Sequence, residues 1–440
     1  MTRRMLRLLC LVPALLAAAG PGDPPPWRLG SPPAEFVLDN GLRVVLQRDD
    51  PLPITVVQLW IGGGDRDDPQ DKPGLAYLTA RLCLEVTEAS MLRRLVDFGS
   101  SFSLDVGGDG ILVTVRSLSR HLDATLEVLA AMLNEPLLSD VRIDGVKGLM
   151  RSLQKQEGDD AFSLLGKAAA KAFYGRPAYG ASRFGSEESL RRIGRRDIQE
   201  FHRGHYAAGN LAAFIASDLG AEELRPLLER RLGRFPAGPR LDARLPAAVT
   251  PQDRALKLER RTSQSLVAVV AALPPPTAGN LAAATLLESW LGRGIGSRLW
   301  ALRSRAGLAY GLGTELWPNR GGMLLGVFLR TESGRLDEAR TELEKLLLEV
   351  REQGVDEAGL AAAKAYARAV HWRQNESRER RAAFLAFLEG AGLSWRLAGG
   401  CAAALEGVGL DEFNSLVRSA LDPEGWLRME IGPGAEDSPQ

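Results

Sequence analysis

Apolar residues along the first half of the chain follow two spacings, one typical of strands and the other of helices. Short runs rich in valine, leucine and isoleucine predict strands, and the turn signal Asn40-Gly41 before the first run indicates a hairpin. Apolar residues that recur every three or four positions predict helices. The expected strands are 42–47, 54–61, 101–106, 111–117 and 211–216, and the expected helices are 75–83, 122–133, 141–153, 161–201 with a break at 174–180, and 224–232.

The second half of the chain repeats this plan. Between the halves, residues 237–252 are rich in proline, glycine and arginine and show little periodicity, which predicts an interdomain linker. We therefore predict an α+β fold of two tandem homologous domains, 34–236 and 253–432, each a mostly antiparallel sheet with helices packed on one face. The expected strands are 256–260, 265–273, 308–317, 323–331 and 426–431, and the expected helices are 281–291, 336–350, 357–372 and 379–388.

The first residues have the pattern of a secretory signal peptide. Three arginines precede the apolar run Leu8–Ala19, which ends in small residues and is too short to cross a bilayer. We expect a signal peptide at 1–19, a linker at 20–33 and export to the periplasm. The mature chain is then expected to carry no transmembrane segment, and residues 433–440 are expected to form a disordered tail.

The composition narrows the possible classes of function. The 440 residues include 55 Lys+Arg and 55 Asp+Glu, so the net charge of zero argues against a protein that binds nucleic acid by charge alone. The 45% of hydrophobic residues are enough for two cores. Cys10 lies in the expected leader, and Cys83 and Cys401 are expected to be buried free thiols, because two distant cysteines are no disulfide framework.

Several motifs, taken in their order and spacing, resemble the insulinase/pitrilysin metallopeptidases, a family that includes the subunits of the mitochondrial processing peptidase. The resemblance covers residues 34–432. The stretches that carry it are Leu38-Asp-Asn-Gly-Leu-Arg-Val-Val45, the Gly62–Gly64 loop with Arg66 and Asp67-Asp68-Pro69, Gly74-Leu75-Ala76, Phe173-Tyr-Gly-Arg-Pro-Ala-Tyr-Gly180, His205-Tyr206 with Asn210, and Gly296-Ser-Arg-Leu-Trp300.

The family's zinc site is an inverted motif, H-x-x-E-H, on the helix after Gly-Leu-Ala, completed by a distal Glu. Two imidazoles and the distal carboxylate bind the metal, and the central Glu takes a proton from the metal-bound water. The matching positions here are Tyr77, Ala80 and Arg81, with Leu153 in place of the distal Glu; Glu157 is close but out of register. The resemblance therefore implies that this chain binds no metal and no cofactor of its own.

The second half resembles the family at two functional positions, whereas the first half lacks the family's metal ligands. The stretch from Ser297 to Tyr310 resembles the family's S-R-L-F-x-x-L-R-x-x-x-G-L-A-Y, with Arg303 and Tyr310 at the positions of its functional Arg and Tyr. The resemblance implies that Arg303 holds substrate carbonyls and that the Tyr310 hydroxyl stabilises the oxyanion. We expect Arg303 near the end of a helix, a turn at Gly307, and Tyr310 at the start of the next strand.

A chain without zinc ligands but with the Arg/Tyr pair resembles the non-catalytic subunit of a heterodimeric family member. The implied partner is a homologous subunit that carries H-x-x-E-H and the zinc, and the implied substrate is a peptide, for which strand 101–106 is a candidate sheet edge. Two alternatives stay open. One is a purely structural or binding protein of the same fold, and the other is an autonomous metallopeptidase with a relocated site, for example at Glu200, His202 and His205.

Overall fold

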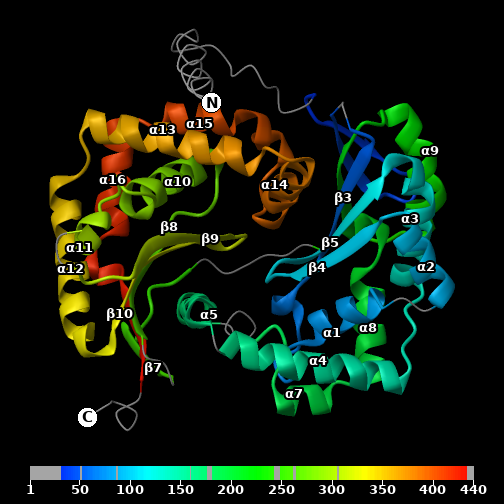
Figure 1. Ribbon diagram of the computed structural model, residues 1–440, viewed down its shortest axis with the longest axis horizontal. Coiled ribbons are helices and arrows are strands. Elements are labelled where there is room, and N and C mark those ends of the chain that lie inside the picture. Colours follow the sequence, from blue (N-terminus) through cyan, green and yellow to red (C-terminus); the bar gives the residue numbers. More distant parts are fainter. Residues whose placement is uncertain are drawn as a thin grey trace, which may run out of the picture.

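Two β-sheets, one from each half of the chain, organise the structure (Figure 1). It is a computed structural model that describes residues 31–49, 52–85, 88–158, 160–175, 181–241, 248–260, 264–304 and 307–433. Within these residues the first sheet has the order β1-β2-β6-β3-β5-β4 and the second the order β7-β11-β8-β10-β9. The strands are β1 (Ala34–Val37), β2 (Arg43–Arg48), β3 (Ile54–Gly62), β4 (Ser101–Val106), β5 (Gly110–Leu118), β6 (Leu211–Ser217), β7 (Ala255–Glu259), β8 (Gln264–Leu273), β9 (Gly311–Asn319), β10 (Gly322–Glu332) and β11 (Leu427–Gly432).

Most of the strand pairs are antiparallel. The two parallel pairs among the described strands are β2 with β6 and β7 with β11, so the two sheets share this feature too. The helices are α1 (Leu75–Cys83), α2 (Ala89–Asp97), α3 (Leu122–Asn134), α4 (Asp140–Gly158), α5 (Ala161–Tyr174), α7 (Glu187–Arg192), α8 (Arg195–His205), α9 (Ala221–Arg231), α10 (Ala278–Gly292), α11 (Trp300–Ser304), α12 (Leu336–Gln353), α13 (Glu357–Gln374), α14 (Arg378–Gly390), α15 (Cys401–Gly407) and α16 (Leu410–Ala420).

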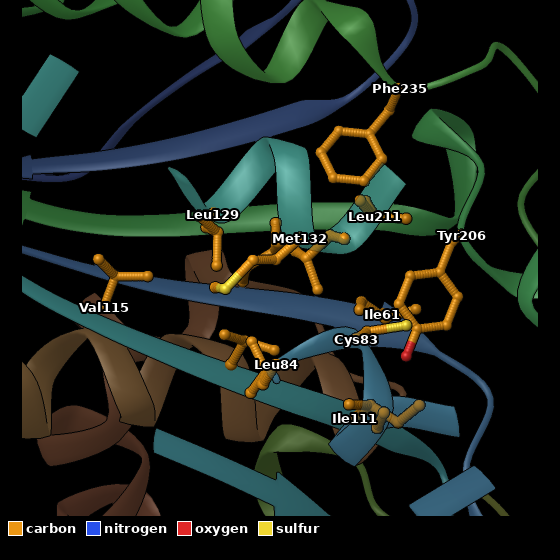
Figure 2. Close-up of a cluster of buried hydrophobic side chains, with 14 of the residues drawn as sticks. Ile61, Cys83, Leu84, Ile111, Val115, Leu129, Met132, Tyr206, Leu211 and Phe235 are labelled. Carbon is orange, nitrogen blue, oxygen red and sulfur yellow. The ribbon is translucent and has the colours of Figure 1, made fainter. Parts of the chain in front are cut away.

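The first sheet separates two cores, because successive side chains of a strand point to opposite faces. On β3, Val57, Leu59 and Ile61 face the helices of the first half, whereas Trp60 faces the other side. Figure 2 shows part of the first core, where Leu129 and Met132 of α3 lie over the strands. The expectation of a sheet with helices packed on it is confirmed for both halves.

Each sheet also receives one helix from the opposite half of the chain. Leu385 and Ala386 of α14, from the second half, are buried with Phe214 of the first sheet. In return, Leu165 and Phe173 of α5, from the first half, are buried against the second sheet. Figure 1 shows both helices in the middle of the molecule. This exchange was not predicted from the sequence. It ties the two halves of the chain together through apolar burial.

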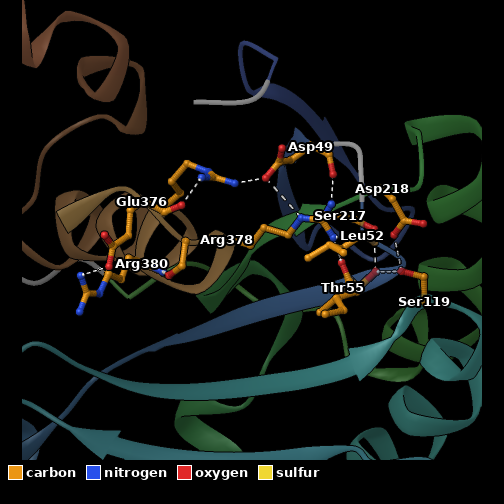
Figure 3. A network of polar contacts seen from close by, with 12 residues as sticks. Asp49, Leu52, Thr55, Ser119, Ser217, Asp218, Glu376, Arg378 and Arg380 are labelled. Carbon is orange, nitrogen blue, oxygen red and sulfur yellow. Dashed lines mark hydrogen bonds and ion pairs between the residues drawn. The ribbon is translucent and has the colours of Figure 1, made fainter. Parts of the chain in front are cut away.

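Ion pairs anchor the first turn of α14 to the first half (Figure 3). The Arg378 guanidinium donates to the backbone carbonyls of Asp49, Leu52 and Ile54, and its Nε lies 3.3 Å from the Asp49 carboxylate. Arg381 also binds the Asp49 carboxylate. The Arg378 and Arg381 side chains are only 9% and 8% exposed, so α14 is fixed in position by buried and partnered charges.

Four elements of the structure were missed from the sequence, and all are short. They are β1, α2, α15 and α16. On α2, Met91, Leu92, Leu95 and Val96 recur at helical spacing, but of these only Leu95 is buried. The expected signal peptide and nearly all of the expected tail lie outside the described residues. No helix among the described residues is both long and apolar enough to span a membrane.

Candidate functional site

The start of α1 is fixed by a buried carboxylate. The two Asp68 oxygens accept hydrogen bonds of 2.7 Å from the backbone N–H groups of Gly74 and Ala76. Gly74 has φ +95°, a left-handed conformation that glycine adopts without strain. Burial raises the pKa of Asp68 to about 7, against the effect of these hydrogen bonds. The loop before α1 is therefore built to hold this helix in place.

The four positions that match the zinc motif lie on two neighbouring helices, α1 and α4, but carry no usable ligands. The Tyr77 ring packs edge-on against Phe184, with the ring centroids 4.8 Å apart, and burial raises the pKa of its phenol. Ala80 is buried and has no functional group. The Arg81 guanidinium forms an ion pair of 2.9 Å with Glu85. Leu153 of α4 is half-buried and apolar.

Nearby groups do not replace the missing ligands. Glu157, one turn beyond Leu153, is engaged by Lys167 and by the Ser182 hydroxyl. Burial raises the pKa of Cys83 to about 12, so its thiol stays protonated and is a poor ligand. Among the described residues no three His, Cys, Asp or Glu side chains are grouped so that they could hold a metal ion. The residues present do not fit zinc.

The histidines considered for a relocated site are packing residues. A ring nitrogen of His202 lies 2.7 Å from the Leu133 carbonyl, and one of His205 lies 2.8 Å from the Phe201 carbonyl. The His205 ring also stacks on the Phe201 ring, at 3.9 Å between centroids. Burial lowers the pKa of both histidines, which keeps them neutral. Backbone hydrogen bonds and ring stacking therefore account for both imidazoles.

A cavity of about 700 Å³ lies between the two halves of the chain. Its wall combines the turn between β4 and β5, part of α5, the end of β9 and part of α14. Acidic side chains outnumber basic ones there, even when Asp65 is left out. The charged residues of the wall are Asp65, Asp105, Asp109, Glu157, Asp160, Lys167, Arg183 and Glu315.

Asp65 is the most unusual group in this wall. Its Oδ1 atom is buried and has no hydrogen-bond partner. Burial raises its pKa to about 8, although Arg183 acts in the opposite direction. Sequence reasoning did not single out this residue. The signal in the sequence was Gly64, the residue before it. The loop packs so closely on the β4–β5 turn that a Cβ on Gly64 would lie 2.0 Å from the Gly107 carbonyl oxygen.

Arg303 and Tyr310 lie on either side of a turn in the second half. Arg303 is in the last turn of α11, exposed, with its guanidinium 5.1 Å from the Trp300 ring centroid. Gly307 has φ +57°. Tyr310 directly precedes β9, is 60% exposed, and donates a hydrogen bond of 2.5 Å from its hydroxyl to the Glu332 carboxylate. The elements are those expected from the sequence.

The structure does not bring this pair to the degenerate zinc positions. Figure 1 shows α11 and α1 on opposite sides of the molecule. Within the described part of the chain, Arg303 and Tyr310 are not hydrogen-bonded to each other. Arg303 lies over the Trp300 ring, and Tyr310 donates to Glu332. Both side chains lie at the surface of the chain.

Two family models match the chain. The model described as "Insulinase (Peptidase family M16)" matches residues 43–180, and the model described as "Peptidase M16 inactive domain" matches residues 192–366. Together the two matches cover more than half of the chain. The degenerate zinc positions fall in the first match, and Arg303 and Tyr310 fall in the second.

Similar proteins carry related names. Human mitochondrial cytochrome b-c1 complex subunit 1 is 24% identical over 205 residues, which are 46% of this chain and 42% of that protein. The uncharacterized zinc protease ML0855 of Mycobacterium leprae is 25% identical over 74% of this chain and 75% of its own length. The chain's match thus spans less than half of the human protein's length.

Solved structures share the fold. A crystal structure of a peptidase M16 inactive domain from Pseudomonas fluorescens superposes with a TM-score of 0.83 at 20% sequence identity. It covers 93% of this chain, and this chain covers 100% of it. At this level of identity the likeness establishes the two-sheet architecture alone.

Proposed function

The chain belongs to the insulinase family of peptidases, and we propose that it is the zinc-free subunit of a two-chain zinc peptidase. In this proposal it supplies Arg303 and Tyr310 to the active site of a homologous partner, which carries H-x-x-E-H and the zinc. One observation carries the proposal. All four metal positions on α1 and α4 have lost their ligands, whereas Arg303 and Tyr310 remain at the surface.

The exposure of Tyr310 supports a role in binding another molecule. Large aromatic side chains contribute most to stability when they are buried, and Tyr310 is 60% exposed. Its pKa is raised by the hydrogen bond to Glu332, so the phenol keeps its proton at neutral pH and would donate it to a substrate on leaving the Glu332 carboxylate. A donor of this kind lowers the energy of an oxyanion in a tetrahedral intermediate.

Arg303 would act beside it as a binding group. Its guanidinium offers several N–H donors in a fixed plane and cannot lose its charge, which suits backbone carbonyls of a peptide. Among the described residues no carboxylate forms an ion pair with Arg303. The guanidinium is therefore free to contact a substrate without first breaking an internal salt bridge.

The peptide would be handled in extended form. β4 is the terminal strand of the first sheet, and its outer edge faces no other described strand, so it suits the addition of a peptide strand. The acidic cavity between the halves begins at the same hairpin. We place the complex in the periplasm, on the pattern of the first residues of the chain.

A reconstitution experiment tests the proposal. The purified chain is expected to cleave nothing alone and to give peptidase activity when mixed with a zinc-bearing homologue. Arg303→Ala and Tyr310→Phe are each expected to lower that activity by about 10²–10³-fold while the complex still forms in size-exclusion chromatography. Arg191→Ala, at an exposed arginine of α7, is the control and should leave activity unchanged. Full activity in both variants would refute the assigned roles.

A second candidate function is a binding protein without a part in proteolysis. The observation that favours it is the hydrogen bond of the Tyr310 hydroxyl to Glu332, which already occupies the donor that catalysis would require. In that case the complex would form with a partner and the two variants would change nothing. The same experiment therefore separates the two candidates.

A further inference from the structure

A second cavity, of about 380 Å³, lies entirely within the second half of the chain. Its wall comes from α10, α13, α14, α15 and β9, and it is separate from Arg303 and Tyr310. Volumes of about 300–1,000 Å³ are typical of small-molecule sites. The cavity is thus large enough for a ligand, and the proposed peptidase role makes no use of it.

The body of the cavity is apolar and incompletely covered. Leu388 and Leu405 are buried in its wall, while Phe387 is 40% exposed and its ring stacks on Phe384 at 6.1 Å between centroids. The His371 imidazole lies 5.5 Å from the Phe384 ring and makes no hydrogen bond to any described residue. A half-buried ring nitrogen without a partner is a place where a ligand can bind.

One end of the cavity is acidic. The Arg293 guanidinium is shared between Glu288, at 2.7 Å, and Glu315, at 3.5 Å. The Glu315 side chain has no other hydrogen bond or ion pair among the described residues, so one negative charge at this end is poorly compensated. The acidic end of the cavity lies near Tyr366 of α13. The Tyr366 ring lies against Gly294, which is next to Arg293 in the chain.

The other end is basic. Arg373 lines the cavity seven residues after Tyr366 on α13, is exposed, and forms no ion pair among the described residues. Seven residues of α-helix rise about 10 Å. The cavity therefore has an acidic end and a basic end about 10 Å apart, with apolar walls and a free imidazole between them.

We propose that this cavity binds a short apolar peptide with free termini, its ammonium group at Glu315 and its carboxylate at Arg373. An extended chain covers about 3.3–3.6 Å per residue, so three residues span the distance. Small apolar side chains would pack on Phe387, and His371 would hydrogen-bond a peptide group. The inference does not depend on the proposed subunit role, because binding is tested on this chain alone.

Calorimetry with the tripeptide Ala-Leu-Ala tests the inference, with its N-acetyl and C-amide forms as matched ligands. The free tripeptide should bind the full chain, and each capped form should bind at least about tenfold more weakly, since each loses a hydrogen-bonded charge. Glu315→Gln should weaken the free and amidated forms while leaving the acetylated form unchanged. Arg373→Gln should weaken the free and acetylated forms while leaving the amidated form unchanged.

Two further variants serve as controls for charge, Glu349→Gln on α12 and Arg191→Gln on α7, both exposed and distant from the cavity in the sequence. Both should bind the free tripeptide as the unmodified chain does. The inference is overturned if the free tripeptide does not bind, if the capped forms bind equally well, or if the control variants weaken binding as much as Glu315→Gln and Arg373→Gln. All four substitutions change exposed or half-exposed side chains, so folding is retained, and circular dichroism verifies it.

Discussion

The hydroxyl of Tyr310 and the carboxylate of Glu332 form a hydrogen bond, with Oη and Oε1 2.5 Å apart. Tyr310 precedes β9 and Glu332 is the last residue of β10, so the bond joins the neighbouring ends of two paired strands. It holds the phenol in one orientation at the surface. A carboxylate acceptor favours the neutral phenol, and the pKa of Tyr310 is raised for that reason.

The first prediction concerns this bond. Glu332→Gln removes the negative charge and should lower the pKa of Tyr310 toward its ordinary value of about 10. Spectrophotometric titration of the tyrosines measures this, and Tyr310→Phe identifies which part of the signal belongs to Tyr310. Glu349→Gln, at an exposed position of α12, is the control. An unchanged titration in Glu332→Gln would show that the carboxylate does not control the phenol.

The second prediction concerns metal content. The purified chain should contain no stoichiometric zinc, because Tyr77, Ala80, Arg81 and Leu153 offer no neutral imidazole or free carboxylate. Elemental analysis by mass spectrometry after dialysis against zinc measures this. One equivalent of zinc per chain that resists a weak chelator would contradict the prediction and revive an autonomous metallopeptidase.

The third prediction concerns the anchor of α14. Arg378→Ala removes a buried guanidinium that binds the Asp49 carboxylate and three backbone carbonyls, which then lose their donors. The free energy of unfolding should fall by about 3–5 kcal/mol. Arg380→Ala is a matched control two residues away, since this arginine is exposed and pairs with Glu376 at the surface. It should change the free energy by no more than about 0.5 kcal/mol.

Urea denaturation measures both variants. Comparable losses in Arg378→Ala and Arg380→Ala would show that the anchor contributes no more than a surface ion pair. The comparison also tests how much these ion pairs add to the apolar contacts of Leu385 and Ala386 in holding α14 on the first sheet. If Arg378→Ala releases α14 from the first sheet while the second half stays folded, the urea denaturation curve would show two transitions.

Local elements could be predicted from the sequence because their signals are local. The expected boundaries of α1 and β4, 75–83 and 101–106, are the observed ones, since Gly74 begins the helix and glycines flank the strand. The turn at Gly307 between Arg303 and β9 was equally readable. In each case the determining residues lie within a few positions of the element.

Long-range arrangements could not be predicted in this way. The α5 pattern shows that Leu165 and Phe173 are buried, but not that they are buried on the sheet of the other half. Asp65 follows three glycines, and nothing local shows that one oxygen of its carboxyl group is buried without a hydrogen-bond partner. Both depend on contacts between segments far apart in the chain, so they appear only in the folded structure.

The last prediction uses the pKa of Asp65, which burial raises to about 8. In the unfolded chain an aspartate has a pKa of about 3.9, so between these two values the folded state holds a proton that the unfolded state has released. The stabilisation from this proton is complete below pH ~4, declines by up to about 1.4 kcal/mol per pH unit, and is lost by pH ~8.

Asp65→Asn removes the titrating group but keeps the size of the side chain. Asp68 also titrates with a raised pKa, and it is present in both proteins, so the difference between the two unfolding free energies isolates Asp65. We expect that difference to move in favour of Asp65→Asn as the pH rises from 5 to 8. Asp144→Asn, at an exposed position of α4, is the matched control for the loss of a carboxylate. If the difference for Asp65→Asn does not change with pH, the Asp65 carboxyl group is solvated and ionised in the folded chain. A carboxyl group makes the free energy of unfolding fall with rising pH only when it stays protonated in the folded state.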